Sequence, residues 1–178
     1  MSTGTPEKLI PRRLDPRKMA HQHAFFRGSI PADALPRLQK AVASVDRVAA
    51  EVEFSLGDDR EKLLRGTLDA TVDVICQRCL EPFSQQIHSD FSIAAVWSEE
   101  EAKALASAYD PWIVGEGEGD LYEILEEELL LSLPVVTFHQ GDCIDAALLS
   151  SGESAAEEAE STPNPFQVLQ QLKGNIKK

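Results

Sequence analysis

Apolar and polar side chains alternate strictly in the segment TLDATVDV, residues 67–74. This two-residue period is typical of a β-strand with one face on the core and one face in water. The same alternation occurs in residues 48–56, where the even positions are apolar, and again in residues 87–97. The sequence GDDR at 57–60, between the first two of these segments, has the composition of a tight turn. We therefore predict an antiparallel meander of at least three strands.

Two other segments have the apolar spacing of amphipathic helices. The first lies near residues 34–45 and has Asp33 as its predicted N-cap, and the second covers residues 120–133 and has Asp120 as its N-cap. In the second helix we expect the glutamates at 126–128 to line the solvated side. Together these elements predict an α+β fold, in which the meander packs against two or more helices.

The chain is long enough for one substantial core, and we predict a single α+β domain over residues 1–149. Residues 1–30 contain several prolines and no sustained periodicity, so we expect a basic extended arm with a short helix within residues 17–26. Its order should depend on contacts. Residues 150–163 are rich in Ser, Glu and Ala and predict a flexible acidic linker, and residues 164–178 predict a short C-terminal helix and tail.

The formal net charge of −13 conceals two blocks of opposite sign. Residues 1–47 contain nine Lys and Arg against four Asp and Glu, a net charge of +5, whereas the rest contains eight against 26, a net charge of −18. A basic block suits the phosphates of RNA, and an acidic body suits a basic protein. Equally, both blocks can simply keep the surface soluble.

No stretch of the sequence approaches the roughly 20 apolar residues of a membrane-spanning helix, and the first residues lack the apolar core of a secretory signal. We therefore expect a cytoplasmic protein with neither a membrane nor DNA as a partner. Three cysteines, an odd number, argue against a disulfide framework and favour reduced thiols or a metal role.

The sharpest local motif is Cys76-Gln-Arg-Cys79, which lies between the second and third predicted strands. Three interpretations compete. The spacing lets both thiolates of one tight turn bind a tetrahedral zinc ion, for which His139 and Cys143 can supply two further ligands. A thiol oxidoreductase is a second interpretation, although the β-pattern after Pro82 does not favour the helix that such a site needs. Finally, the cysteines can be small apolar residues packed in a turn.

Other catalytic patterns do not assemble. No Walker motif, Gly-x-Ser-x-Gly or His-Glu-x-x-His pattern is present. We expect His21 and His23 to be solvent-exposed residues of the basic arm rather than bases or ligands. The sequence therefore predicts a protein that is not an enzyme and has no catalytic residues.

Several motifs, in their order along nearly the whole chain, resemble the bacterial YceD family. They are Leu14-Asp15-Pro16, Ser44-Val45-Asp46, Cys76-Gln77-Arg78-Cys79 with Pro82-Phe83, the run EELLLSLPVV at 127–136, and the terminal Asn164-Pro165-Phe166 with Val168, Leu169, Leu172 and Lys173. This resemblance implies a role in ribosome biogenesis, namely in the synthesis, processing or stability of 23S ribosomal RNA. The family offers no established catalytic residues to carry over.

From the resemblance and the charge pattern we expect a binding protein whose partner is 23S rRNA or a pre-50S particle, together with a ribosomal protein or ribonuclease. The predicted contacts are largely with phosphates. An alternative is an acidic adaptor that binds a ribosomal protein or nuclease without touching RNA. The residues predicted to contact RNA or a partner are Arg12, Arg13, Arg17, Lys18, Asn164, Phe166 and Lys173.

Overall fold

A computed structural model of the chain describes residues 8–115 and 117–145. The chain divides into two compact units, residues 1–143 and residues 144–178, and every helix and strand described below belongs to the first. The linker predicted at 150–163 and the helix predicted at 164–178 lie outside the described residues. Within the described part, no helix has the length and apolar character needed to cross a membrane.

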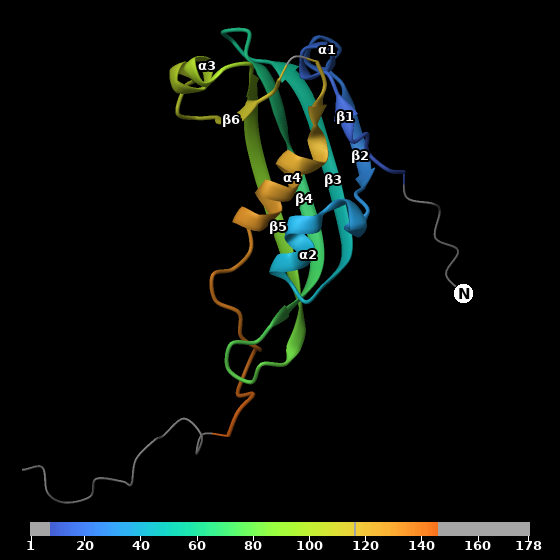
Figure 1. Ribbon diagram of the computed structural model, residues 1–178, viewed down its shortest axis with the longest axis vertical. Coiled ribbons are helices and arrows are strands. Elements are labelled where there is room, and N and C mark those ends of the chain that lie inside the picture. The colour runs from blue at the N-terminus through green and yellow to red at the C-terminus, as the bar shows by residue number, and fades with distance from the viewer. Residues whose placement is uncertain (1–7, 116, 146–178) are drawn as a thin grey trace, which may run out of the picture. The chain divides into compact units, whose positions relative to one another are not determined.

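The centre of the first unit is a five-stranded sheet with the order β2-β3-β4-β5-β6 (Figure 1). Its three long strands, β3, β4 and β5, form the predicted antiparallel meander, and the short β6 pairs with β5 in parallel. The α+β prediction is confirmed. The five strands are β2 (Phe25–Ser29), β3 (Ser44–Leu56), β4 (Lys62–Ile75), β5 (Pro82–Val96) and β6 (Asp110–Ile113).

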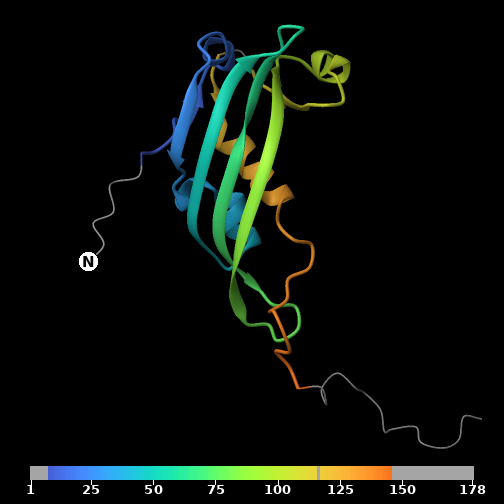
Figure 2. The ribbon, with the colours of Figure 1, turned by 180° about the vertical axis from the view of Figure 1, so that it is seen from behind.

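Helices α2 (Pro36–Ala41) and α4 (Leu121–Leu131) cover one face of this sheet. Figure 2 shows the opposite face, across which no helix of the described residues runs. The alternation seen in the sequence explains this arrangement, because the apolar parity of each strand faces the helices. Val52, Leu68 and Ile93 come from three neighbouring strands and are each fully buried in this core. Leu125 of α4 is fully buried in the same core.

The first predicted helix is shorter than the sequence indicates. A 3₁₀ turn, η1 (Ala32–Ala34), precedes α2, and α2 ends at Ala41 with β3 beginning at Ser44, so the prediction of a helix near 34–45 is wrong over residues 42–45. Asp33 lies in η1 and does not cap α2. The predicted N-cap of the second helix is confirmed, because the Asp120 side chain accepts hydrogen bonds from the backbone N–H groups of Tyr122 and Glu123.

Glu126 takes the place of the missing cap on α2. Its Oε1 accepts hydrogen bonds from the backbone N–H groups of Arg37 and Leu38, at 2.7 and 2.9 Å. Glu126 is only 4% exposed, so the prediction that it lies on the solvated side of α4 is wrong. The physical reason is that the first N–H groups of a helix need acceptors, and a carboxylate from a neighbouring helix supplies one here.

The N-terminal arm is docked on the rest of the unit from residue 8 onward. Residues 8–10 bond to Ser29 at the edge of β2. Next, β1 (Arg13–Leu14) pairs with β7 (Gly119–Asp120), and α1 (Pro16–His21) follows. The helix is thus shorter than the expected 17–26, because a turn at residues 22–24 follows it and β2 begins at Phe25. Gly28 permits this close docking, because a Cβ atom there would overlap the carbonyl oxygen of Lys8.

The remaining helix, α3 (Glu99–Ala104), follows β5 and was not predicted. It is six residues long, as are α1 and α2, and helices of that length leave little periodicity in a sequence. The short strands β1, β6 and β7 escaped prediction for the same reason. They are two to four residues long, so an alternating pattern has no room to develop.

Candidate functional site

The Cys76–Cys79 segment forms a tight turn between the ends of β4 and β5. Its backbone is closed by two hydrogen bonds, from the Cys76 N–H to the Glu81 carbonyl oxygen and from the Leu80 N–H to the Cys76 carbonyl oxygen, both 2.9 Å long. Leu80 follows the turn with φ of +62°, a left-handed conformation that reverses the chain direction. The motif predicted from the sequence therefore lies where expected, between the second and third meander strands.

A second segment, which follows α4, runs back alongside this turn. The Gln77 N–H donates a hydrogen bond of 2.9 Å to the carbonyl oxygen of Thr137, and the Thr137 hydroxyl donates one of 2.7 Å to the carbonyl oxygen of Ile75. These two bonds fix the register between segments that are about 60 residues apart in the sequence. As a result, His139 and Cys143 reach the same place as the two cysteines of the turn.

The four predicted metal ligands converge on one point. One ligand atom from each of Cys76, Cys79, His139 and Cys143 lies within 4.8 Å of the other three. The two sulfurs of Cys76 and Cys143 are 3.7 Å apart, and the Cys79 sulfur is 3.3 Å from Nδ1 of His139. A tetrahedral ion with bonds of about 2.0–2.3 Å separates its ligands by about 3.3–3.8 Å. The site, which we call the Cys3His cluster, can therefore hold a metal ion.

Arg78 joins the two halves of the Cys3His cluster. Its Nη2 donates hydrogen bonds to the carbonyl oxygens of His139 and Gly141, at 2.8 and 2.6 Å, and its guanidinium carbon lies 5.1 Å from the centre of the Phe138 ring. The ring of Phe83 also packs against the ring of His139, with 4.7 Å between the two ring centres. These contacts orient the ligand-bearing segment, a function that outer partners commonly have at metal sites.

The environment of the cluster favours the thiolate form of Cys76. Burial of the Cys76 thiol acts to raise its pKa, but hydrogen bonds from backbone groups of Cys79, His139 and Arg78 outweigh burial and lower the pKa to about 5. Burial raises the pKa of Cys143, and the neighbouring sulfurs of Cys76 and Cys79 raise it further. At neutral pH the cluster thus presents the deprotonated sulfur that metal binding needs.

The geometry does not support the oxidoreductase interpretation. In a thioredoxin-like site, the N-terminus of a helix stabilises the attacking thiolate. Here the two cysteines occupy a turn between strands, and no helix of the described residues begins at either. Cys76 is fully buried, which also denies access to a protein substrate.

The basic residues predicted to contact RNA lie at the other end of the meander, around β1 and α1. All four, Arg12, Arg13, Arg17 and Lys18, are exposed. Two of them are also bound within the protein. Arg12 forms an ion pair of 3.0 Å with Asp120, and the Arg17 guanidinium lies 4.0 Å from the centre of the Trp97 ring.

Three other predicted contact residues, Asn164, Phe166 and Lys173, lie outside the described residues. His21 and His23 were predicted to be solvent-exposed, and both are exposed in the structure. His23 has φ of +47°, which shows that it serves as a turn residue between α1 and β2.

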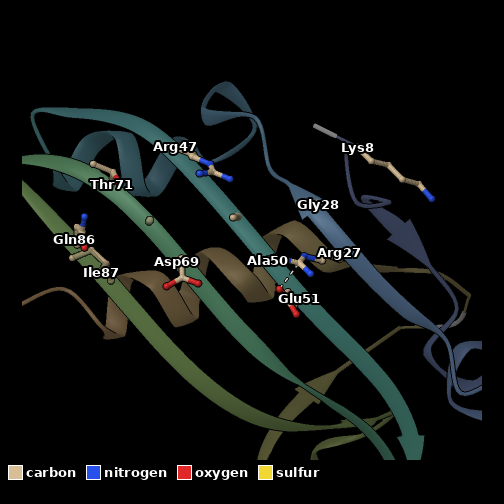
Figure 3. A pocket seen from close by; sticks show the side chains of 12 residues that line it. Lys8, Arg27, Gly28, Arg47, Ala50, Glu51, Asp69, Thr71, Gln86 and Ile87 are labelled. Atoms are coloured by element: carbon tan, nitrogen blue, oxygen red, sulfur yellow. Dashed lines mark ion pairs between the residues drawn. The ribbon is translucent and has the colours of Figure 1, made fainter. Parts of the chain in front are cut away.

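The uncovered face of the sheet holds a polar hollow of about 480 Å³ that was not predicted (Figure 3). Lys8, Arg27 and Arg47 line one part of it, and Arg27 forms an ion pair of 3.0 Å with Glu51. Asp69 lines another part and accepts a hydrogen bond from His88, which raises the pKa of that histidine. The alternation in the sequence shows which side chains of the strands are polar and face away from the core. It does not show that Lys8 docks beside β2, so the hollow could not be predicted.

Comparison with known proteins assigns the family. The sequence profile described as "Large ribosomal RNA subunit accumulation protein YceD" matches residues 64–173 of this chain. The chain is 35% identical over 168 residues to the Large ribosomal RNA subunit accumulation protein YceD of Haemophilus influenzae, with 92% of this chain and 96% of that protein covered. No solved structure matches. The chain therefore belongs to the YceD family of large ribosomal RNA subunit accumulation proteins.

Proposed function

We propose that this protein supports the accumulation of 23S ribosomal RNA by binding the RNA or a precursor of the large subunit, without catalysing a reaction. The observation that carries the proposal is the family match, which extends over 92% of the chain to a relative with that name.

For the RNA contact we favour the exposed cations around β1 and α1. Arg13 and Lys18 form no ion pair with another residue of the described ranges, so both charges are available to phosphates. Arg12 and Arg17 are held by their partners within the protein, which fixes where their guanidinium groups point. Contacts of this kind give affinity with little sequence preference.

We also propose that the Cys3His cluster binds zinc. Three thiols and one imidazole nitrogen form one of the common ligand sets of structural zinc, and a closed set of four leaves no open position for a reacting molecule. Zinc would thus join the β4–β5 turn to residues 137–143 and stabilise that end of the protein. In our proposal for RNA binding, zinc has a structural role only.

The test of the RNA contact uses the full-length, zinc-loaded protein and purified 23S rRNA. We expect the double substitution Arg13→Glu with Lys18→Glu to weaken binding at least about tenfold and to reduce the salt dependence of the affinity. The matched control is Lys40→Glu with Lys103→Glu, which changes the net charge equally at exposed sites outside β1 and α1. This control should bind nearly as tightly as the unmodified protein.

The corresponding test in cells measures the ratio of 23S to 16S rRNA. Loss of the protein should lower this ratio, and the unmodified gene should restore it. An unchanged ratio would overturn the proposed function. If the ratio falls but the Arg13 and Lys18 substitutions bind RNA normally and restore the ratio, direct contact through this surface is wrong and the acidic-adaptor alternative gains support.

A further inference from the structure

A second cleft lies beside the Cys3His cluster, at the end of the sheet far from α1. Its volume is about 510 Å³, within the usual range of ligand-binding clefts. Its walls come from the end of α2 and the two residues after it, from the end of β4 with the following turn, and from the segment after α4. Most of the lining side chains are aliphatic, and they include Val42, Val74, Ile75, Leu80, Leu133 and Pro134.

Exposed apolar side chains are concentrated around this cleft. The described residues contain nine large hydrophobic side chains with high exposure, and five of them lie at 75–80 and 135–138. Leu80 is 74% exposed and Val135 is 93% exposed, whereas the leucine and valine side chains of the core are almost completely buried. A concentration of this kind usually marks a surface that another molecule covers.

A single charge accompanies the aliphatic lining. Lys40 is the one charged side chain in the described lining of the cleft, and it forms no ion pair with another described residue. Its neighbours Ala41, Val42 and Ala43 are small or apolar. The cleft is therefore complementary to a segment that presents aliphatic side chains together with a carboxylate.

We propose that this cleft, the Lys40 cleft, is the docking site for a partner protein's segment that carries aliphatic side chains and at least one acidic residue. RNA is a poor match, because one cation cannot neutralise a series of phosphates. No aromatic side chain belongs to the described lining on which a base could stack. This site lies apart from the cations of β1 and α1, so it does not depend on the proposed RNA contact.

The Cys3His cluster shapes the wall of the cleft. Gln77 and Thr137 both line the cleft, and the hydrogen bond between them joins the β4–β5 turn to the segment after α4. Zinc on the four ligands would hold the same two segments together. Release of the ion should therefore open the cleft and reduce docking, a consequence that can be measured separately.

The test uses two synthetic hexapeptides with blocked termini, one of alternating leucine and glutamate and one of alternating leucine and lysine. Fluorescence anisotropy measures their binding to the full-length, zinc-loaded protein, and amide chemical shifts show where they bind. We expect the acidic peptide to bind better than the basic one and to shift residues 40–43, 74–80 and 133–137. Lys40→Glu should weaken the acidic peptide about three- to tenfold, and Leu80→Ser at least about tenfold.

Lys103→Glu is the matched control, because this exposed lysine lies on α3 and does not line the cleft. It should leave peptide binding unchanged, and thermal unfolding should show that Lys40→Glu and Leu80→Ser remain folded. The proposal is overturned if neither peptide binds, if both bind equally, or if Lys103→Glu weakens binding as much as Lys40→Glu. It is also overturned if an RNA oligonucleotide, or a second copy of the chain, shifts the cleft residues in place of the acidic peptide.

Discussion

The two ends of the meander are held together in different ways. At the Cys3His end, four ligands from two distant segments meet within 4.8 Å of one another, so a single bound ion would join the segments in addition to the hydrogen bonds of Gln77, Arg78 and Thr137. At the α1 end, the chain is fixed by many weaker contacts, such as the Arg12–Asp120 ion pair, the Arg17–Trp97 contact and the β1–β7 pairing. Loss of one ion would therefore remove four links at the first end in a single step, whereas the second end should weaken gradually as single contacts are removed.

The same contrast separates two kinds of surface. The α1 end presents cations whose directions are set by internal partners, which suits contact with phosphates. The Cys3His end presents aliphatic side chains around a single lysine, which suits a protein segment. If both proposals are right, the protein brings an RNA and a second protein together, and substitutions can remove either surface without changing the other.

The largest expected effect follows from removal of the proposed zinc ion. A chelator, or the substitution Cys79→Ser, should abolish stoichiometric zinc binding, because three ligands hold a structural ion far less tightly than four. Hydrogen exchange of the Gln77 amide, which donates to Thr137, should then accelerate at least about tenfold. Mass spectrometry under native conditions measures the zinc content, and amide exchange measures the release of the segment.

The α1 end supplies the internal control for that experiment. The Leu121 amide, which donates a 2.7 Å hydrogen bond to the carbonyl oxygen of Arg12, should keep its exchange rate when zinc is removed. If that amide accelerates as much as Gln77, the metal holds the whole unit together and the contrast between the ends is wrong. If neither changes although zinc is lost, the cluster has no structural role.

The sequence was sufficient where a local pattern and the final structure agree. The two-residue alternation predicted β3, β4 and β5, and the Asp120 cap predicted the start of α4. The four cluster ligands were also named from their residue types and spacing, and the structure brings them together. Ligand chemistry limits the choice of residues strongly, since few cysteines and histidines are present.

Prediction failed where a feature depends on contacts between residues that are distant in the sequence. Glu126 looks like part of a solvated run of glutamates, and only the position of α2 shows that it is a cap. The Lys40 cleft could not be predicted either, because its walls come from three stretches of the chain that are distant in the sequence. The hollow on the open sheet face needs Lys8 to be placed beside β2. Such features depend on tertiary contacts, which periodicity does not report.

A smaller effect is expected from Glu126, which caps α2 and is not part of the Cys3His cluster. Glu126→Ala would leave the backbone N–H groups of Arg37 and Leu38 without their acceptor, and the Leu38 bond is buried. We expect a loss of about 2–4 kcal/mol in the free energy of unfolding, measured by urea denaturation. Glu127→Ala is the matched control. Glu127 is half-exposed in its ion pair with Arg37, so the loss there should stay below about 1 kcal/mol.

The two glutamate variants also separate capping from metal binding. Zinc content should remain stoichiometric in Glu126→Ala, because neither α2 nor α4 supplies a ligand. Equal destabilisation by the two substitutions would show that the surface ion pair, and not the cap, stabilises α2. Loss of zinc in Glu126→Ala alone would show that the cluster needs the helices to be fixed first.

The smallest expected effect lies at the α1 end. Arg17→Ala removes the contact with the Trp97 ring, and an exposed cation–π contact contributes about 0.5–1 kcal/mol. Because Lys62 also lies over the same ring, at 5.9 Å, part of the interaction should persist and the loss should fall at the lower end of that range. Urea denaturation measures the stability, and the fluorescence of Trp97 reports the local change.

Lys18→Ala is the control for this variant, since Lys18 is the next residue of the same helix and has no ring contact among the described residues. It should alter stability by less than about 0.5 kcal/mol. A loss of several kcal/mol in Arg17→Ala would mean that the α1 end also depends on a single interaction. In that case α1 would come loose in a single step, because the ion pair and the strand pairing that remain could not hold it in place.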